Sequence, residues 1–245
     1  MALIKPAAYL QLLETGKYSD LVIDCQGVEF NVHRTVVCPQ SAMLDAACSG
    51  KFEEAHTGRI KFPEQHPYIM ARAILFMYTA DHLLPDFLIK KITQDQKDAL
   101  GEIFSYTFRE IDELDMRRLK VNALLYGCAD MLGIEDLKTI ASELFMEVAA
   151  LAFEYDGFEE PLQLLYENTR PDDCDLRLKV TGLCVENHDL LETRTKTLEV
   201  LQDHEPNVWH VSVELFKRWT SSQQGQSMEK LPLRNRGRLS KTTMK

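Results

Sequence analysis

The sequence predicts an α+β fold that is mainly helical. Runs rich in β-branched residues are confined to the stretch 20–62, whereas apolar residues recur at helical spacing before and after it. The chain has 245 residues, of which 45% are hydrophobic and 27% charged, which is ordinary globular composition. A chain of this length can bury a sizeable core.

The predicted strands come early in the chain. Two of them, at 21–24 and 28–32, flank Gln26-Gly27, a pair of residues suited to a hairpin turn. Along the second strand apolar and polar residues alternate, which is typical of a sheet with one buried face. A third strand is predicted at 59–62.

Helices are predicted around these strands, each with its own boundary signals. Ser41 suits the N-cap of a helix that Gly50 ends, and Pro39 is expected to end a short helical turn. Pro67 suits the first position of a longer helix, and Gly133 separates a helix pair. The predicted helices are 7–15, 35–38, 42–48, one that begins at Pro67, 121–132 and 134–149.

Composition divides the chain into a main domain, an extension and a tail. A main domain ends before the boundary at Asp156-Gly157 and carries a polar, partly helical insertion at about 81–120. Residues 157–220 form a helical extension with helices at 160–167, 174–188 and 204–219, the middle one capped by Asp172. The tail, 221–245, is basic and poor in large apolar residues, so it is predicted to be disordered.

Charge and motifs exclude several classes of function. The formal net charge of −10 argues against binding to nucleic-acid backbones or anionic membranes. The common nucleotide-binding, hydrolase and metalloprotease motifs are absent, and the histidines do not cluster at metal-ligand spacing. The chain is therefore expected not to be an enzyme and to hold no cofactor, metal or small-molecule ligand.

The cysteines and the absence of export signals indicate the compartment. The cysteines are scattered without a C-x-x-C pair, which predicts free thiols in a reducing environment. Neither a signal peptide nor a membrane-spanning run is evident. The expectation is a soluble intracellular protein of the cytoplasm, the nucleus or both.

Two features of the 20–62 stretch are candidates for function. Asp20 and Arg34 flank the hairpin, where they are either an exposed ion pair or a partly buried pair at a dimer interface. Phe52 stands in a polar loop, Phe52-Glu53-Glu54-Ala55, either as a staple onto the core or as an exposed anchor for a partner helix.

Read in order, these residues resemble the BTB/POZ family. The matching motifs are Ser19-Asp20-Leu21-Val22, Phe30-x-Val32-His33-Arg34-x-Val36-Val37, Ser41, Phe52-x-Glu54-Ala55, Tyr78-Thr79-Ala80 and the stretch Leu125–Lys138. Family members commonly carry Gly where this chain has Ala80. The segments Leu165-Tyr166-Glu167-Asn168-Thr169 and Leu176-Arg177 are similar to those of fungal-type BTB proteins with a helical C-terminal extension.

The resemblance covers roughly residues 8–150, which sets the bounds of the predicted BTB/POZ domain. It implies a small mixed sheet flanked by helices and a non-catalytic protein-interaction module. It implies a homodimer interface at Tyr9, Leu10, Leu13, Asp20 and Arg34. Some family members are substrate adaptors of cullin-RING ubiquitin ligases, and their cullin-binding residues correspond to Phe52, Glu54 and Tyr78.

Alternative functions remain open on the sequence alone. The leading hypothesis is an adaptor that joins a cullin to an unknown protein substrate. The alternative is a homo-oligomerisation or scaffold protein, linked to transcription, that does not bind cullin. The basic run within 228–245 is compatible with a nuclear-import or nucleic-acid patch as well as with a solvated tail.

Overall fold

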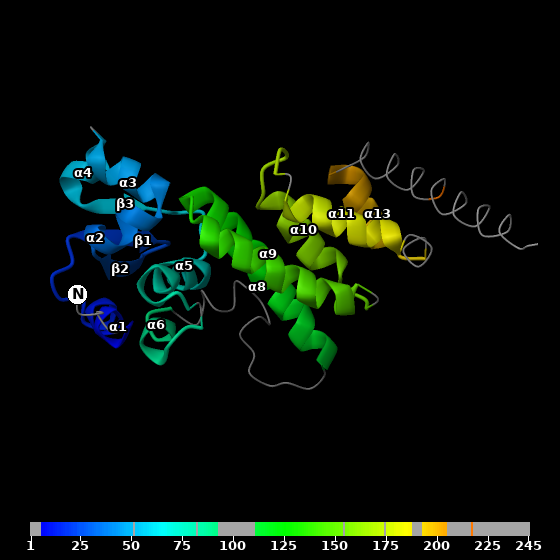
Figure 1. Cartoon of the computed structure of the whole chain (residues 1–245), viewed down its shortest axis with the longest axis horizontal. Coiled ribbons are helices and arrows are strands. Elements are labelled where there is room, and N and C mark those ends of the chain that lie inside the picture. Colours follow the sequence, from blue (N-terminus) through cyan, green and yellow to red (C-terminus); the bar gives the residue numbers. More distant parts are fainter. Residues whose placement is uncertain are drawn as a thin grey trace, which may run out of the picture.

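The computed structural model describes most of the chain, which forms an elongated molecule (Figure 1). The sheet and its surrounding helices stand at one end, and the helical extension stands at the other. The described residues are 6–50, 52–81, 83–92, 111–153, 155–173, 175–187, 193–204 and 217. The tail 221–245, the predicted helix at 204–219 and much of the predicted insertion therefore lie outside the described residues.

A three-stranded mixed sheet is the first structural unit. β1 (Leu21–Cys25) is central, with β2 (Val28–Val32) antiparallel on one side and β3 (Arg59–Lys61) parallel on the other. Gln26 and Gly27 both have positive φ, at 51° and 83°, which is the conformation that a tight hairpin turn requires. The predicted hairpin is confirmed, and the α+β, mainly helical class is confirmed with it.

Short helices surround the sheet: α1 (Pro6–Thr15), α2 (Arg34–Val37), the 3₁₀ turn η1 (Cys38–Gln40), α3 (Ala42–Ser49) and α4 (Glu53–Thr57). The Ser41 hydroxyl accepts a hydrogen bond from the Leu44 N–H at 3.2 Å, as expected of an N-cap. Pro39 does not end the chain's helical turn. It lies inside η1, because a proline in a first turn has no N–H that needs a partner.

The helix α5 (Pro67–Thr79) is the core helix of the sheet domain, and most of its side chains are buried. It begins at Pro67, as predicted, after His66 caps it by accepting from the Tyr68 N–H. It ends at Ala80, which adopts the left-handed conformation with φ of 57°. A further short helix, α6 (Asp86–Ile89), lies within the stretch predicted as an insertion.

A long antiparallel helix pair follows and connects the two ends of the molecule. It consists of α8 (Ile111–Leu132) and α9 (Glu135–Ala152), joined by Gly133 at φ of 68°. The helix α8 begins at Ile111 and not at Val121 as predicted. Residues 121–129 of α8 are buried on nearly every side, which is typical of a helix enclosed by its neighbours.

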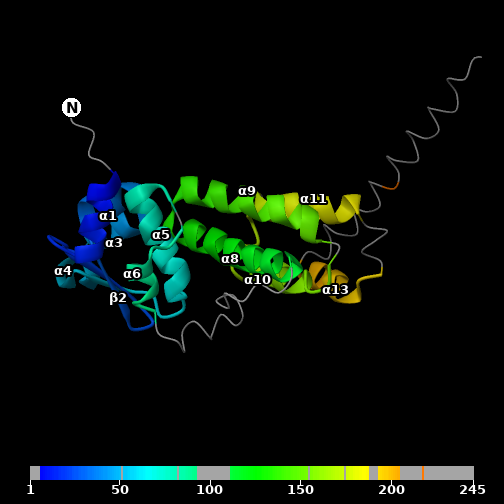
Figure 2. The same ribbon diagram turned by 90° about the horizontal axis from the view of Figure 1, so that it is seen from below.

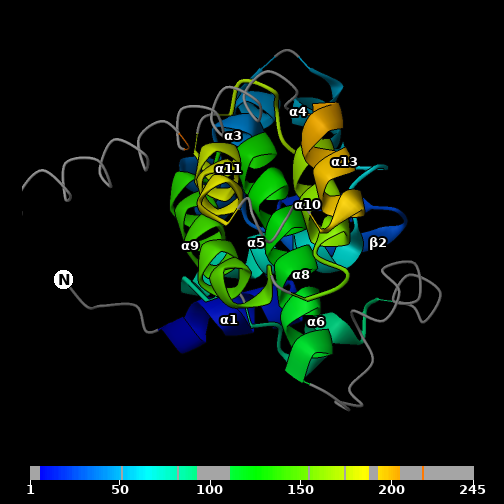
Figure 3. The same cartoon turned by 90° about the vertical axis from the view of Figure 1, so that its right-hand side faces the viewer.

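The extension comprises α10 (Glu159–Glu167), α11 (Leu176–Glu186) and α13 (Thr195–His204). α10 packs along α8, and α11 packs against α9, where Lys179 donates to the Ser142 hydroxyl, so α8 with α10 and α9 with α11 form two rows (Figure 2). Asp172 does not cap α11, since Asp175 occupies the N-cap position. The helix α13, which the sequence did not predict, packs on α10 (Figure 3).

Two close contacts fix the extension to α8. Gly127 faces the backbone of Asn168 so closely that an added Cβ would lie 2.3 Å from the Asn168 carbonyl oxygen. The buried Tyr126 hydroxyl donates to the Asp173 carboxylate at 2.8 Å, and Lys138 of α9 reaches the same carboxylate at 2.8 Å. A single cluster of buried apolar side chains consequently extends from the sheet to Leu201 of α13.

Candidate interaction surface

Helix α4 presents the candidate partner residues at its first turn. Phe52 is the residue before the helix and its side chain is 62% exposed, so it is not a staple onto the core. Its ring lies against Gly50, where an added Cβ would come within 2.7 Å of the ring. Glu54 is half-buried in the first turn, where the helix dipole favours a carboxylate. Phe52 and Glu54 therefore stand together on one short helix.

Asp20 and Arg34 do come together, but through the main chain. The exposed Asp20 carboxylate accepts a hydrogen bond from the backbone N–H of Arg34 at 2.8 Å. The Arg34 guanidinium points instead to α4, where it donates to the Ala55 carbonyl at 3.3 Å. Its Nε is buried without a hydrogen-bond partner among the described residues. The pair thus connects the hairpin to the helix that carries Phe52 and Glu54.

Tyr78 is buried and does not share an exposed surface with Phe52. Its hydroxyl accepts from the backbone N–H of His33 at 2.9 Å and lies 2.7 Å from His33 Nδ1. Because His33 Nε2 faces the Lys17 carbonyl at 2.8 Å, Nε2 carries the ring proton and Nδ1 accepts from Tyr78. Burial raises the pKa of the Tyr78 hydroxyl well above its ordinary value.

Helix α1 covers α5 of its own domain. Leu13 is buried in that contact, and Tyr9 and Leu10 are half-buried beside it. Only Tyr9 and Leu10 of the three retain surface for a second copy of the chain. Tyr18, three residues beyond the end of α1, is 76% exposed.

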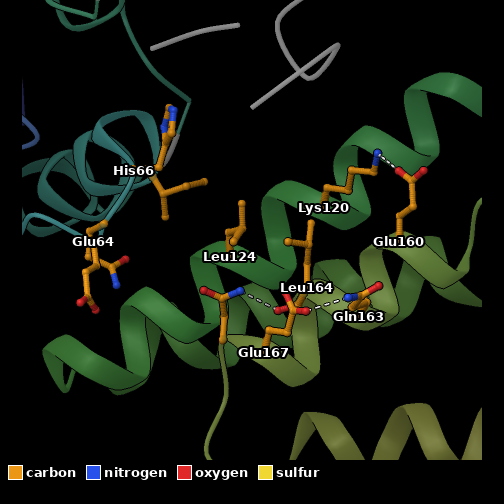
Figure 4. A pocket seen from close by; sticks show the side chains of 11 residues that line it. Glu64, His66, Lys120, Leu124, Glu160, Gln163, Leu164 and Glu167 are labelled. Carbon is orange, nitrogen blue, oxygen red and sulfur yellow. Dashed lines mark hydrogen bonds and ion pairs between the residues drawn. The ribbon is translucent and has the colours of Figure 1, made fainter. Parts of the chain in front are cut away.

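A cleft of about 410 Å³ lies between the sheet domain and the extension (Figure 4). The segment from Glu64 to Ile69 forms one wall, α10 forms the other, and Leu124 of α8 lies at the bottom. On α10, Glu160, Gln163, Leu164 and Glu167 follow helical spacing and line the same wall. The sequence did not predict this site, because its residues come from three segments and only the α10 stripe is visible as a pattern.

The described cysteines are free thiols at several depths. Burial raises the pKa of Cys25, Cys128 and Cys184 to about 12. Burial and a hydrogen bond with Cys48 raise the pKa of Cys38 to about 12. Protonated thiols of this kind are poor nucleophiles and poor metal ligands. Cys174 lies outside the described residues.

In the described part of the chain, no cluster of three or more His, Cys, Asp or Glu side chains could hold a metal ion. Within the same residues, none of the helices combines the length and the apolar character needed to cross a membrane.

The sheet domain is thus a small mixed sheet ringed by helices, with an exposed Phe52 and a lateral cleft. Residues 9–98 match the family model of the BTB/POZ domain, and the chain carries a domain of that family. The resemblance seen in the sequence is thereby confirmed over residues 9–98, and the similarity to fungal-type proteins with a helical extension stays a prediction. No curated protein matches the chain. BTB/POZ domains are typically non-catalytic modules for protein–protein interaction.

Proposed function

We propose that the chain is an adaptor whose BTB/POZ domain binds a cullin scaffold through Phe52 and Glu54, while the extension or the 81–120 stretch recruits a protein substrate. The observation that carries the proposal is the 62% exposure of Phe52 at the position of the family's hydrophobic-x-Glu motif. A large aromatic side chain in water at a fixed helix start is the kind of residue that dominates small interfaces.

The surroundings of Phe52 fit a partner helix that combines apolar and basic side chains. Glu53, Glu54 and Thr57 line a depression of about 430 Å³ beside Arg59 and Lys61. Arg59 is already paired with Asp24 at 3.2 Å and with Glu29 at 2.7 Å. The Glu53 and Glu54 carboxylates therefore remain as the acceptors for a basic residue of the partner.

Tyr78 has a positioning role in this proposal. Its side chain is buried, so it contacts no partner directly in the conformation described. It holds His33, the residue that precedes α2, and Arg34 of α2 reaches Ala55 of α4. Through these contacts, Tyr78 helps to hold α4, which carries the proposed partner surface, in place.

Co-purification with the N-terminal domain of a cullin tests the adaptor proposal. Wild type is expected to bind, whereas Phe52→Ala and Glu54→Lys are each expected to weaken binding at least tenfold. Tyr155→Ala is the control, because it removes another exposed aromatic side chain, 42% accessible, that lies between α9 and α10. If wild type shows no binding, or if Tyr155→Ala weakens it as much as Phe52→Ala does, the adaptor proposal fails.

A homo-oligomerisation or scaffold role, such as in transcriptional regulation, is the second candidate. Its support is the half-exposed face of α1 formed by Tyr9 and Leu10, next to the exposed Tyr18. Light scattering of wild type and Leu10→Glu tests it. A dimer that the substitution converts to a monomer supports self-association, and a monomeric wild type rejects it. Asp20 and Arg34 are proposed to act at this interface only by holding the hairpin against α2 and α4.

A further inference from the structure

The cleft between the sheet domain and α10 has an apolar floor and an acidic rim. Ile69 is buried in its wall, and Leu124 and Leu164 are half-buried on facing helices. Glu64 and Glu167 are exposed at the two edges. A ligand that fits this cleft must combine apolar side chains with positive charge.

The carboxylates of the rim are only partly neutralised by the protein itself. Lys120 pairs with Glu160 at one end of the cleft. Glu167 accepts a hydrogen bond from Gln163 at 2.7 Å, which leaves its charge in place. Glu64 makes no hydrogen bond or ion pair with any described residue. The described lining therefore keeps a net negative charge.

The chain contains a segment of the required composition. Residues 228–245 read MEKLPLRNRGRLSKTTMK, in which three leucines stand among the basic residues. Six basic residues against one Glu give this segment a charge of +5. The net charge of the whole chain is −10, so the other residues together carry −15. The positive charge of the chain is thus concentrated in the one segment whose apolar residues also match the cleft.

The segment is attached close enough to reach the cleft. The helix α13 ends at His204, whose ring stacks on Tyr166 of α10 with the ring centroids 5.1 Å apart. This anchors the chain on the helix that forms one wall of the cleft. Between His204 and Lys230 lie 25 residues, which span up to about 80 Å when extended. Intramolecular binding is therefore compatible with chain length.

We propose that this cleft is a docking site for the chain's own segment Met228–Lys245. Leucine side chains of the segment fill the floor at Leu124 and Leu164, and its arginines pair with Glu64 and Glu167. While the segment is bound, the cleft is closed to other basic, apolar peptides, so the segment is an internal competitor. This inference is independent of cullin binding, since neither Phe52 nor Glu54 lines the cleft.

The test uses the full-length chain and a fluorescent peptide of residues 228–245. The triple variant R234E/R236E/R238E in the full-length chain should leave the cleft free. Fluorescence anisotropy is expected to show at least tenfold tighter peptide binding to this variant than to wild type, where the attached segment competes. Adding Glu64→Lys and Glu167→Lys to the triple variant is expected to weaken peptide binding at least tenfold.

Glu147→Lys in the triple variant is the matched control, because Glu147 is exposed on α9 away from the cleft. Equal weakening by Glu147→Lys, or equal binding of a scrambled peptide, would mean attraction by overall charge and would overturn the proposal. Failure of the peptide to bind the triple variant would overturn it as well. Circular dichroism verifies that each variant is folded, and none of these measurements involves a cullin.

Discussion

At the scale of single residues, the buried Tyr78 hydroxyl has a clearly defined environment. It accepts from the His33 N–H and donates to His33 Nδ1, and both partners lie inside the sheet domain. Removing the hydroxyl would leave a buried donor and a buried acceptor without partners. A buried polar group without a partner costs more free energy than the hydrogen bond itself contributes, because water cannot reach the group and take the place of the lost hydroxyl.

Tyr78→Phe is therefore expected to lower the free energy of unfolding by about 1–3 kcal/mol. Chemical denaturation followed by circular dichroism measures this change. Tyr18→Phe is the control, because the Tyr18 side chain is 76% exposed and its hydroxyl is free to bond to water. Equal stabilities of Tyr78→Phe and wild type would show that the His33 contacts are not maintained in solution.

Ala80 is the second informative residue, since it ends α5 in the left-handed conformation at φ of 57°. An L-residue with a Cβ is strained there, whereas glycine is not. Ala80→Gly is expected to raise the free energy of unfolding by about 0.5–1 kcal/mol.

The opposite substitution, glycine to alanine, at the junction between α8 and α9 supplies the comparison. Gly133→Ala, at φ of 68°, is expected to lower stability by about 1 kcal/mol. Thermal unfolding of both variants measures the two shifts. If both variants shift in the same direction, strain in the left-handed conformation is not the cause.

At the scale of elements, the contact between α8 and α10 depends on the missing side chain of Gly127. A Cβ at this position would lie 2.3 Å from a backbone oxygen, and backbone cannot move aside as a flexible side chain can. Gly127→Ala is expected to lower the free energy of unfolding by about 2 kcal/mol or more. It should also loosen α10, which hydrogen exchange of residues 159–167 would detect.

Gly182→Ala is the matched control for this substitution. Gly182 lies inside α11 and an added Cβ meets nothing within 4 Å. Alanine is a better helix former than glycine, so stability is expected to rise by about 0.5–1 kcal/mol. A loss of stability in both variants would show that alanine is disfavoured in these helices for a reason other than the close approach of Asn168.

The elements also show which parts of the structure could be predicted from sequence. The hairpin was predictable because its alternation and its Gln26-Gly27 turn are local signals. Helix α4 was missed because four of its five residues are polar and because it ends at Gly58 in the left-handed conformation. The start of α8 was placed too late because acidic residues before Val121 suggested a solvated loop. Helix α13 was missed because only Thr197 and Leu201 are buried along it.

The candidate site was predictable only in part, for a similar reason. Phe52 and Glu54 are neighbours in sequence, so one motif indicated both. The hydrogen bond between the Tyr78 hydroxyl and His33 joins residues 45 positions apart, and no local pattern reveals it. The cleft is assembled from segments near residues 64–69, 120–124 and 160–168, and its existence follows from how α10 packs on α8.

At the scale of the whole molecule, a partly buried charge network joins the main domain to the extension. Lys138 of α9 contacts Asp130 of α8 at 2.6 Å and Asp173 of the extension at 2.8 Å. Burial alone would raise the pKa of Asp173, but hydrogen bonds from Lys138 and Tyr126 outweigh it, and the net pKa is lowered. Burial alone would lower the pKa of Lys138, but its carboxylate partners raise it above its ordinary value.

These shifts predict how stability depends on pH. Asp173 binds its proton more readily in the unfolded chain, so its contribution is complete above the ordinary value of 3.8 and is lost as the pH falls below it. Lys138 holds its proton more tightly in the folded chain, so its contribution is complete below 10.5 and is lost as the pH rises further.

Asp173→Asn is expected to lower the free energy of unfolding at neutral pH by about 3 kcal/mol, because Lys138 loses a buried partner. Its stability should also fall less steeply in acid than that of wild type. Denaturation measured from pH 7 to pH 3 tests both effects. The control is Glu143→Gln, an exposed carboxylate in the middle of α9. An acid profile of Asp173→Asn that parallels wild type would contradict the assignment.

The burial of three cysteine thiols makes it possible to follow by experiment how the whole molecule opens. Cys25 lies in the sheet, Cys128 in the connecting helix α8, and Cys184 in α11 of the extension, and each is buried. An alkylating reagent can reach each thiol only when the part of the molecule around that thiol opens. Mass-spectrometric pulse labelling of the unmodified protein would therefore report the order in which the sheet, the connecting helix and the extension open, with no introduced probe.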